Sequence, residues 1–260
     1  MDHYEPGSDD RIYLFGFSRG AFTARSLAGM LFKCGLLQKG SHNLLPYVSK
    51  LYNTGGNDDI AKGFKNTYCH ECKPYFIGVW DTVASLGHFY GKRLFDDKLR
   101  GQIMFGYHAV SIDEKRKKFP VNLWDDTKKQ RKQTIEQVWF AGVHSDVGGW
   151  YPKRGLSDSA LKWMLLKADA AGIRLRDGWD SKEKINPDPT DKDLKHESRE
   201  GFYRLWRKVQ RTIPEDALIH QSVFERIDAG IGYNPSNLPE AYSIVQWDGA
   251  ISASTKSTGA

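Results

Sequence analysis

A serine between two glycines stands near the start of the chain, in Gly16-Phe17-Ser18-Arg19-Gly20. A G-x-S-x-G pattern is typical of a nucleophile elbow when a strand precedes it and a helix follows it, because the sharp turn exposes the hydroxyl. The small residues Gly16 and Gly20 would let the strand and the helix approach each other closely. The backbone N–H of Arg19, at the positive end of the helix, would donate to the oxygen of a reacting carbonyl group. We therefore predict that Ser18 is the nucleophile of a serine hydrolase.

A serine hydroxyl needs a base, and that base needs an acid that fixes its tautomer. Among the eight histidines we select His144, which directly follows an apolar run and begins a glycine-containing segment. Asp81 also follows an apolar run directly and is our first choice for the acid. Asp146 stays open as the alternative acid, although residues two positions apart in an extended loop usually point apart. Two further histidines call for control mutations: His88 and His220.

Three apolar runs would position these side chains, because each run ends directly before one of them: residues 11–17, 75–80 and 138–143. Continuous apolar runs of this length favour strands that are buried on both faces of a parallel sheet. In open α/β sheets, ligands bind beyond the carboxyl ends of the strands. The connections between the runs are long enough for crossover helices. We therefore predict an α/β fold, with a predominantly parallel sheet flanked by helices and with the three side chains at the ends of neighbouring strands.

Helical spacing predicts three helices around this sheet. The first spans Arg19–Phe32 and ends at Gly35, and the second lies near Leu99–Asp113. The third starts at a Ser157 cap and runs to about residue 171, where Gly172 stops it.

Changes in composition divide the chain into four parts. Residues 1–175 are predicted to form a partial core that carries the site, and residues 176–200, which are polar and interrupted by prolines, a long loop. Residues 201–247 are predicted to be a C-terminal appendage packed on this core, and residues 248–260 a disordered tail.

Composition sets the broad class, since 40% hydrophobic and 27% charged residues are typical of a globular protein. The first residues do not resemble a secretory signal peptide, and no apolar run approaches the ~20 residues that a membrane-spanning helix needs. Three cysteines, an odd number, fit a reducing compartment, which predicts a cytoplasmic protein unless secretion without a cleaved signal occurs. Cys69 and Cys72 offer only half of a tetrahedral zinc site, so we predict no metal and no cofactor.

The net charge of +6 comes largely from two basic runs, residues 115–118 and 128–132. Such runs are usually solvated loops, and the alternative is a surface that meets an anionic membrane. No nucleic-acid-binding motif accompanies them, so nucleic acid is not expected as a partner.

Six segments together resemble one known family: residues 14–29, 77–83, 108–114, 138–149, 156–164 and 219–223. This is the family of uncharacterised α/β-hydrolase domains that includes the catalytic domains of type VI secretion phospholipase effectors, and the resemblance extends from Tyr4 to Leu238. It implies an α/β-hydrolase fold and a triad of Ser18, Asp81 and His144. It further implies that the substrate is a carboxylic ester, of a lipid or phospholipid in some members.

The chain departs from the family pattern at its start. Family members begin with a strand that ends in Asp-Gly-Thr and precedes the nucleophile by several elements, whereas only 17 residues precede Ser18 here. The resemblance therefore implies an N-terminally truncated member that lacks the opening strands and the second oxyanion donor that they carry. We expect such a chain to be weakly active or inactive alone, to act as a binding module, or to need a second chain or an upstream segment that completes the sheet.

Overall fold

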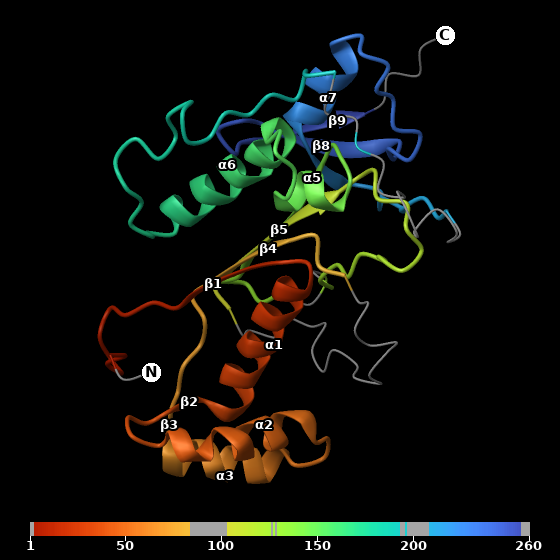
Figure 1. Cartoon of the computed structure of the whole chain (residues 1–260). Helices are drawn as coiled ribbons and strands as arrows, with labels where there is room; N and C mark the ends of the chain where they lie inside the picture. Colours follow the sequence, from red (N-terminus) through yellow and green to blue (C-terminus); the bar gives the residue numbers. More distant parts are fainter. Residues whose placement is uncertain are drawn as a thin grey trace.

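One seven-stranded sheet organises the computed structural model, which describes residues 3–83, 103–125, 127, 129–192, 196 and 208–255. All neighbouring strands run parallel except the last pair. Parallel neighbours require crossover connections, and helices fill several of these, so the predicted α/β class is confirmed (Figure 1). In spatial order the strands are β1 (Tyr13–Phe17), β4 (Phe76–Trp80), β5 (Phe105–Ser111), β6 (Thr134–Phe140), β7 (Ala217–His220), β8 (Ala241–Val245) and β9 (Ile251–Thr255).

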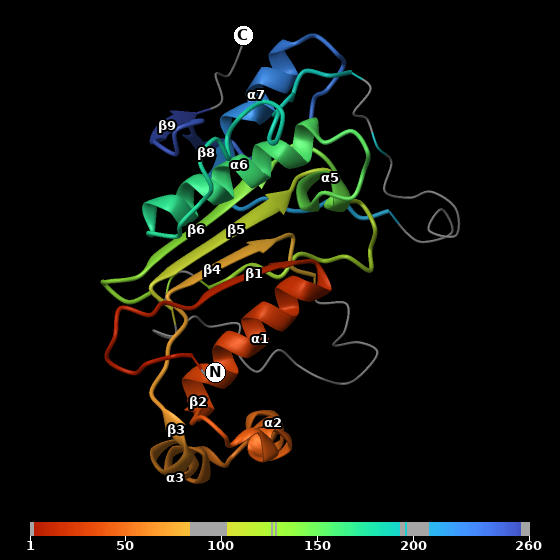
Figure 2. The ribbon, with the colours of Figure 1, turned by 60° about the vertical axis from the view of Figure 1, so that its left-hand side comes forward.

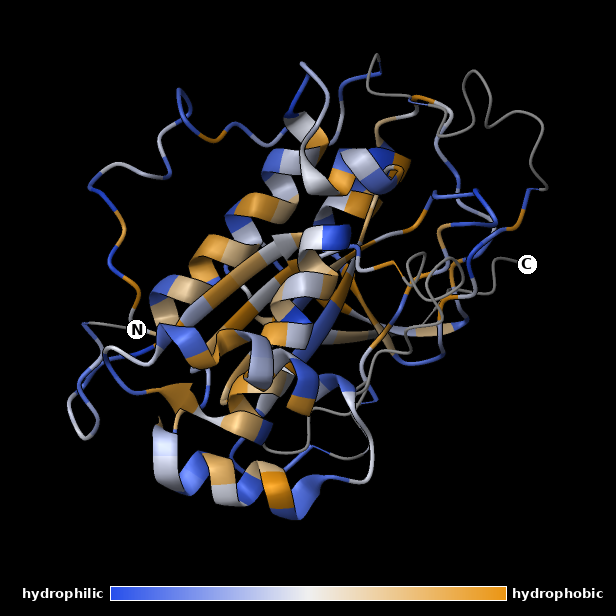
Figure 3. Cartoon of the chain, turned by 60° about the horizontal axis from the view of Figure 1, so that its bottom comes forward, coloured by the Kyte–Doolittle hydropathy of each residue, from blue (hydrophilic) through white to orange (hydrophobic). Residues whose placement is uncertain are grey.

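Helices cover both faces of the sheet. Figure 2 shows α1 (Arg19–Cys34) on one face and α6 (Gly155–Ala170), with the short α5 (His144–Gly148), on the other. Apolar side chains of β1 and β4 pack against both helical layers. Figure 3 shows hydrophobic residues along the strands and the helices beside them. A further helix of the described residues, α7 (Gln221–Asp228), follows β7.

A small unit at the far end of α1 lies away from the carboxyl ends of the strands (Figure 1). It packs around Cys34, Leu37, Val48, Leu51, Phe64 and Cys69. All cysteines of the chain are buried and unpaired. The unit consists of β2 (Leu36–Leu37), the 3-10 helix η1 (His42–Leu44), α2 (Leu45–Asn53), α3 (Asp58–Tyr68) and β3 (Cys69–His70).

The predicted helix near Leu99–Asp113 is wrong wherever the structure describes it. Phe105–Ser111 form the strand β5 at the centre of the sheet, and six of these seven residues are buried. Burial on both faces removes the alternation that marks a strand, so the apolar run was open to a helical interpretation. The predicted start of the third helix also needs correction, since α6 begins at Gly155 and the Ser157 hydroxyl donates to the Arg154 carbonyl oxygen instead of capping the first turn.

The predicted C-terminal appendage and disordered tail are also wrong for the described residues. β7 and β8 lie within 201–247 and extend the main sheet, and β9 lies within the predicted tail. These strands have only four or five residues, too few for a clear periodic signal. The described part of 176–200 has neither helix nor strand, as predicted, whereas 201–207 and 256–260 lie outside the described residues.

β1 lies at one edge of the sheet and not inside it. It pairs with β4 on one side, and no described strand pairs with its other side. Phe15 is 41% exposed, so the prediction that this run is buried on both faces is wrong.

Candidate active site

The turn from β1 into α1 has the backbone of a nucleophile elbow. Ser18 adopts φ 55° and ψ −117°, a strained conformation for a residue with a side chain, and its N–H donates to the Trp80 carbonyl oxygen at 3.0 Å. A Cβ on Gly16 would lie 2.3 Å from the Gly20 carbonyl oxygen, so only glycine fits there. A Cβ on Gly20 would meet no described atom within 4 Å, so steric crowding explains the first glycine and not the second.

Ser18, His144 and Asp81 lie in one hydrogen-bonded line. His144 Nε2 is 2.8 Å from Ser18 Oγ, and His144 Nδ1 is 2.5 Å from Asp81 Oδ2. Neutral imidazole carries one proton, and the carboxylate at Nδ1 holds it there, so Nε2 is free to accept the serine proton. The three residues follow β1, β4 and β6, with β5 between the last two, so the predicted neighbouring strands are in fact spread over four positions.

Asp146, the alternative acid, does not contact His144 in the described contacts. It lies in the first turn of α5, where its Oδ2 accepts the Val143 N–H at 2.9 Å. Its Oδ1 is 2.6 Å from Nδ1 of His196, a residue that sequence reasoning did not select. The segment after β6 is thus a short helix and not the predicted extended loop, and the helix turns Asp146 away from the imidazole of His144.

Arg211 is a further member of the site that no sequence pattern indicated. Its Nη1 is 2.5 Å from Asp81 Oδ1, and its Nη2 is 2.9 Å from Asp81 Oδ2. The Ser111 N–H donates to the same carboxylate at 3.0 Å. Complete burial alone would raise the pKa of Asp81, but the charge of Arg211 and the hydrogen bonds from His144 and Arg211 outweigh it and hold this pKa well below its ordinary value.

A second carboxylate supports the backbone of His144. Glu114 follows β5, accepts the His144 N–H at 3.3 Å and forms an ion pair with Arg116 at 2.8 Å. The sequence held a signal for it, because the apolar run of β5 ends before Asp113 and Glu114 as the other runs end before Ser18, Asp81 and His144. We missed that signal because the run was interpreted as a helix.

The family model described as "T6SS, Phospholipase effector Tle1-like, catalytic domain" matches residues 1–167. The chain belongs to this family. An uncharacterized protein of Saccharomyces cerevisiae, YEL023C, is 41% identical over 132 residues, which cover 46% of this chain and 19% of that protein. The chain thus spans about a fifth of the length of this curated relative.

Two solved structures are similar to parts of the chain. A crystal structure of an uncharacterized protein from Pseudomonas aeruginosa matches 68% of this chain and 26% of its own, at 24% identity and a TM-score of 0.45. The structure of the Tle1 effector bound to the VgrG spike of the type 6 secretion system matches 54% and 25%, at 25% identity and a TM-score of 0.30.

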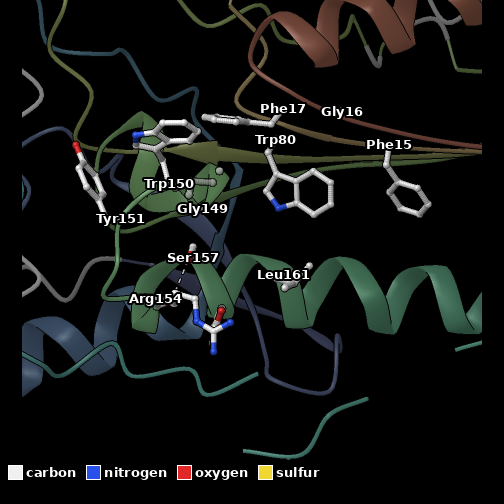
Figure 4. Close-up of a pocket in the computed structure, with 13 residues that line it drawn as sticks. Phe15, Gly16, Phe17, Trp80, Gly149, Trp150, Tyr151, Arg154, Ser157 and Leu161 are labelled. Carbon is white, nitrogen blue, oxygen red and sulfur yellow. Dashed lines mark hydrogen bonds and ion pairs between the residues drawn. The ribbon is translucent and has the colours of Figure 1, made fainter. Parts of the chain in front are cut away.

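An aromatic groove lies beside the turn that carries Ser18, and Figure 4 shows the side chains that line it. The groove has a volume of about 470 Å³ and lies between the edge strand β1, the end of α5 and the start of α6. Phe17 belongs to both places, since it lines the groove and its ring centroid lies 4.6 Å from that of the His144 imidazole. A Cβ on Gly148 would lie 2.0 Å from the Phe17 ring, so this glycine makes room for it. The groove is lined mainly by aromatic and apolar side chains, among them Phe15, Phe17, Trp80, Trp150, Tyr151 and Leu161.

The remaining predicted residues have these places. Arg19 is the first residue of α1, where backbone N–H groups have no partner within the helix and can serve an oxyanion. His220 ends β7, fully buried, with its Nδ1 2.9 Å from Ser222 Oγ and its ring stacked on Phe140, and His88 lies outside the described residues. In the described part of the chain no cluster of three or more His, Cys, Asp or Glu could hold a metal ion, and no helix there is long and apolar enough to cross a membrane.

Proposed function

We propose that this chain is a serine hydrolase that cleaves a carboxylic ester of a lipid or phospholipid through an acyl-enzyme on Ser18. The observation that carries the proposal is the hydrogen-bonded line from Ser18 Oγ through the imidazole of His144 to Asp81. Membership of the phospholipase effector family supports a lipid ester as the substrate.

In the proposed reaction, His144 Nε2 takes the Ser18 proton while Oγ forms a bond to the acyl carbon of the ester. The imidazolium then gives this proton to the leaving alcohol oxygen as the C–O bond breaks. Water, deprotonated by the same nitrogen, attacks the acyl carbon. The imidazolium then returns this proton to Ser18 Oγ as the bond from Oγ to the acyl carbon breaks, and the carboxylic acid is released. Asp81 stays ionised throughout and holds the imidazole in the tautomer that the first step needs.

The first turn of α1 faces the carbonyl oxygen that becomes negative in this reaction. Backbone N–H groups at a helix N-terminus stabilise such an oxyanion, and that of Arg19 is the nearest in sequence to the nucleophile. Removal of one such donor typically costs about 10²–10³ in rate. This effect acts on the transition state and not on substrate binding.

The aromatic groove supports an apolar acyl chain as the part of the substrate that is bound beside the triad. Concave sites lined by aromatic side chains bind through buried apolar area. Trp150, at the groove and 80% exposed, is a side chain of the kind that is enriched where apolar and aqueous surroundings meet. If the surface around Trp150 meets a membrane, the groove opens toward the lipid.

A fluorophosphonate probe tests the nucleophile directly, because it labels only an activated serine. We expect labelling of the wild-type chain and its loss in Ser18→Ala, while Ser49→Ala, which changes an exposed serine of α2, keeps it. Nitrophenyl esters of increasing acyl length should then show hydrolysis that also depends on Ser18. A folded wild-type chain that is neither labelled nor active would contradict the proposal and favour a binding module.

A further inference from the structure

We propose that Arg211 is a positioning residue that sets the pH range in which His144 can act as a base. The inference rests on the proposed function, because it presupposes that His144 is the base and Asp81 its acid. It then explains why a buried arginine is paired with that carboxylate. Within the described residues, the hydrogen bonds of its guanidinium go to Asp81, Ser111 and Phe119, so we infer that Arg211 acts through Asp81.

The contact between Arg211 and Asp81 is bidentate and excluded from water. Nη1 and Nη2 each reach one carboxylate oxygen, and the two side chains are 5% and 0% exposed. A planar guanidinium matches a carboxylate in this geometry, which a lysine ammonium cannot reproduce. The pair therefore fixes both the charge and the rotation of the acid.

The rest of the structure holds Arg211 in place. Its Nη1 also donates to the carbonyl oxygen and the hydroxyl of Ser111, at 2.9 and 2.8 Å, and its Nη2 to the carbonyl oxygen of Phe119 at 3.1 Å. Asn237 donates to the Arg211 carbonyl oxygen at 3.0 Å. The guanidinium thus connects Asp81, directly after β4, to the end of β5 and to the loop that follows β5.

His144 contacts two carboxylates, Asp81 through its imidazole and Glu114 through its backbone N–H, and each of these carboxylates has its own arginine. Asp81 after β4 is paired with Arg211, and Glu114 after β5 is paired with Arg116. Asp146 on α5 itself is turned to another partner, His196.

Two aromatic rings complete these surroundings, with centroids 4.6 Å (Phe17) and 5.1 Å (Phe119) from that of the imidazole. The site is therefore close to neutral when the imidazole is neutral, which is the form that a general base needs.

Removal of the Arg211 charge should protonate the base over a wider pH range. A buried carboxylate without a counter-charge stabilises an adjacent imidazolium strongly, whereas a shared carboxylate does so less. In Arg211→Met, a substitution that keeps much of the side-chain bulk, we expect the acidic limb of the kcat/KM profile to move up by about one pH unit. At a pH on that limb, the rate should fall about tenfold for this reason alone.

Two variants separate this role from a structural one. Arg211→Lys keeps a positive charge, so its limb should stay within about 0.3 pH unit of wild type although its kcat falls. Arg226→Met removes another buried arginine, which donates to the carbonyl oxygens of Pro189 and Asp191, and its limb should not move. A folded Arg211→Met with lower kcat and an unmoved limb would overturn the inference, as would a limb that moves by a full unit in Arg211→Lys. The lysine variant decides the matter if Arg211→Met does not fold.

NMR titration of the His144 imidazole gives a readout that needs no hydrolysis. We expect its midpoint to rise in Arg211→Met and to stay in Arg226→Met. An inactive wild-type chain would then count against the proposed function, whereas an unmoved midpoint would count against the role of Arg211.

Discussion

Two carboxylate–imidazole pairs lie close to each other in the chain, and their hydrogen bonds are nearly equal. His144 and Asp81 are 2.5 Å apart, and His196 and Asp146 are 2.6 Å apart. Their second contacts differ, because His144 presents its other nitrogen to Ser18, whereas the ring of His196 stacks on Tyr151 at 3.7 Å. A short hydrogen bond from an acid to an imidazole therefore does not by itself identify a catalytic pair.

The charge environment separates the two acids further. The pKa of Asp81 is lowered, as the charge of Arg211 and the hydrogen bonds outweigh complete burial. Burial raises the pKa of Asp146, and the Val143 N–H and His196 only partly offset this. The surroundings of the first acid thus favour its ionised form, whereas burial disfavours the ionised form of the second.

The largest expected difference between the pairs is in activity. Asp81→Asn should lower kcat by about 10⁴, because the amide can hold the imidazole in the wrong tautomer. Asp146→Asn should change kcat less than tenfold, since its side-chain oxygen can still accept the Val143 N–H. Ester hydrolysis by the two purified variants at one pH makes the comparison. Equal losses in both would mean that the second pair also takes part in the reaction.

Sequence patterns predicted that Ser18, Asp81 and His144 lie together, which their contacts confirm, but they predicted the elements around these residues less well. Ser18, Asp81 and His144 each follow an apolar run, and the carboxyl ends of parallel strands meet at one edge whichever strand lies between them. The prediction that these side chains meet does not depend on where the helices begin and end. The mistaken prediction of a helix over β5 therefore did not affect it. The family resemblance was right for the same segments.

Arg211 and His196 could not be predicted, for a physical reason. Each reaches its acid from a distant part of the chain, Arg211 across 130 residues and His196 across 50. Neither follows an apolar run or belongs to a short motif, and a buried charge is recognisable only once its counter-charge has been placed. The short strands β7 to β9 were missed because four or five residues do not establish a period.

The second expected difference lies in how stability depends on pH. The pKa of Asp146 is higher in the folded state than its value of about 3.9 in the unfolded chain. The wild type therefore loses stability as the pH rises from about 3.9 through the folded pKa. Asp146→Asn removes this loss, so its stability relative to wild type should improve between pH 4 and pH 7. A lowered folded pKa has the opposite sign, and the stabilisation by Asp81 is complete above about pH 4 and is lost only below it.

The deficit of Asp81→Asn should therefore be large and nearly constant from pH 4.5 to pH 7. Urea denaturation of the wild type and both variants across this range measures the two trends. A parallel pH dependence of the two variants would contradict the difference in charge environment.

The smallest expected effect concerns His196, and it tests whether the second pair is only structural. His196→Phe keeps a flat ring against Tyr151 but removes the hydrogen bond to Asp146. The loss should cost about 1 kcal/mol of unfolding free energy, a typical net value for one hydrogen bond, because the Val143 N–H still donates to the carboxylate. Labelling of Ser18 and the acidic limb of the kcat/KM profile should not change, since the acid that contacts His144 is Asp81 and not Asp146. A shift of that limb in His196→Phe would instead show that the protonation of the His196–Asp146 pair affects His144. The conclusion that the charge environment of His144 is set by Arg211 and Asp81 would then fail.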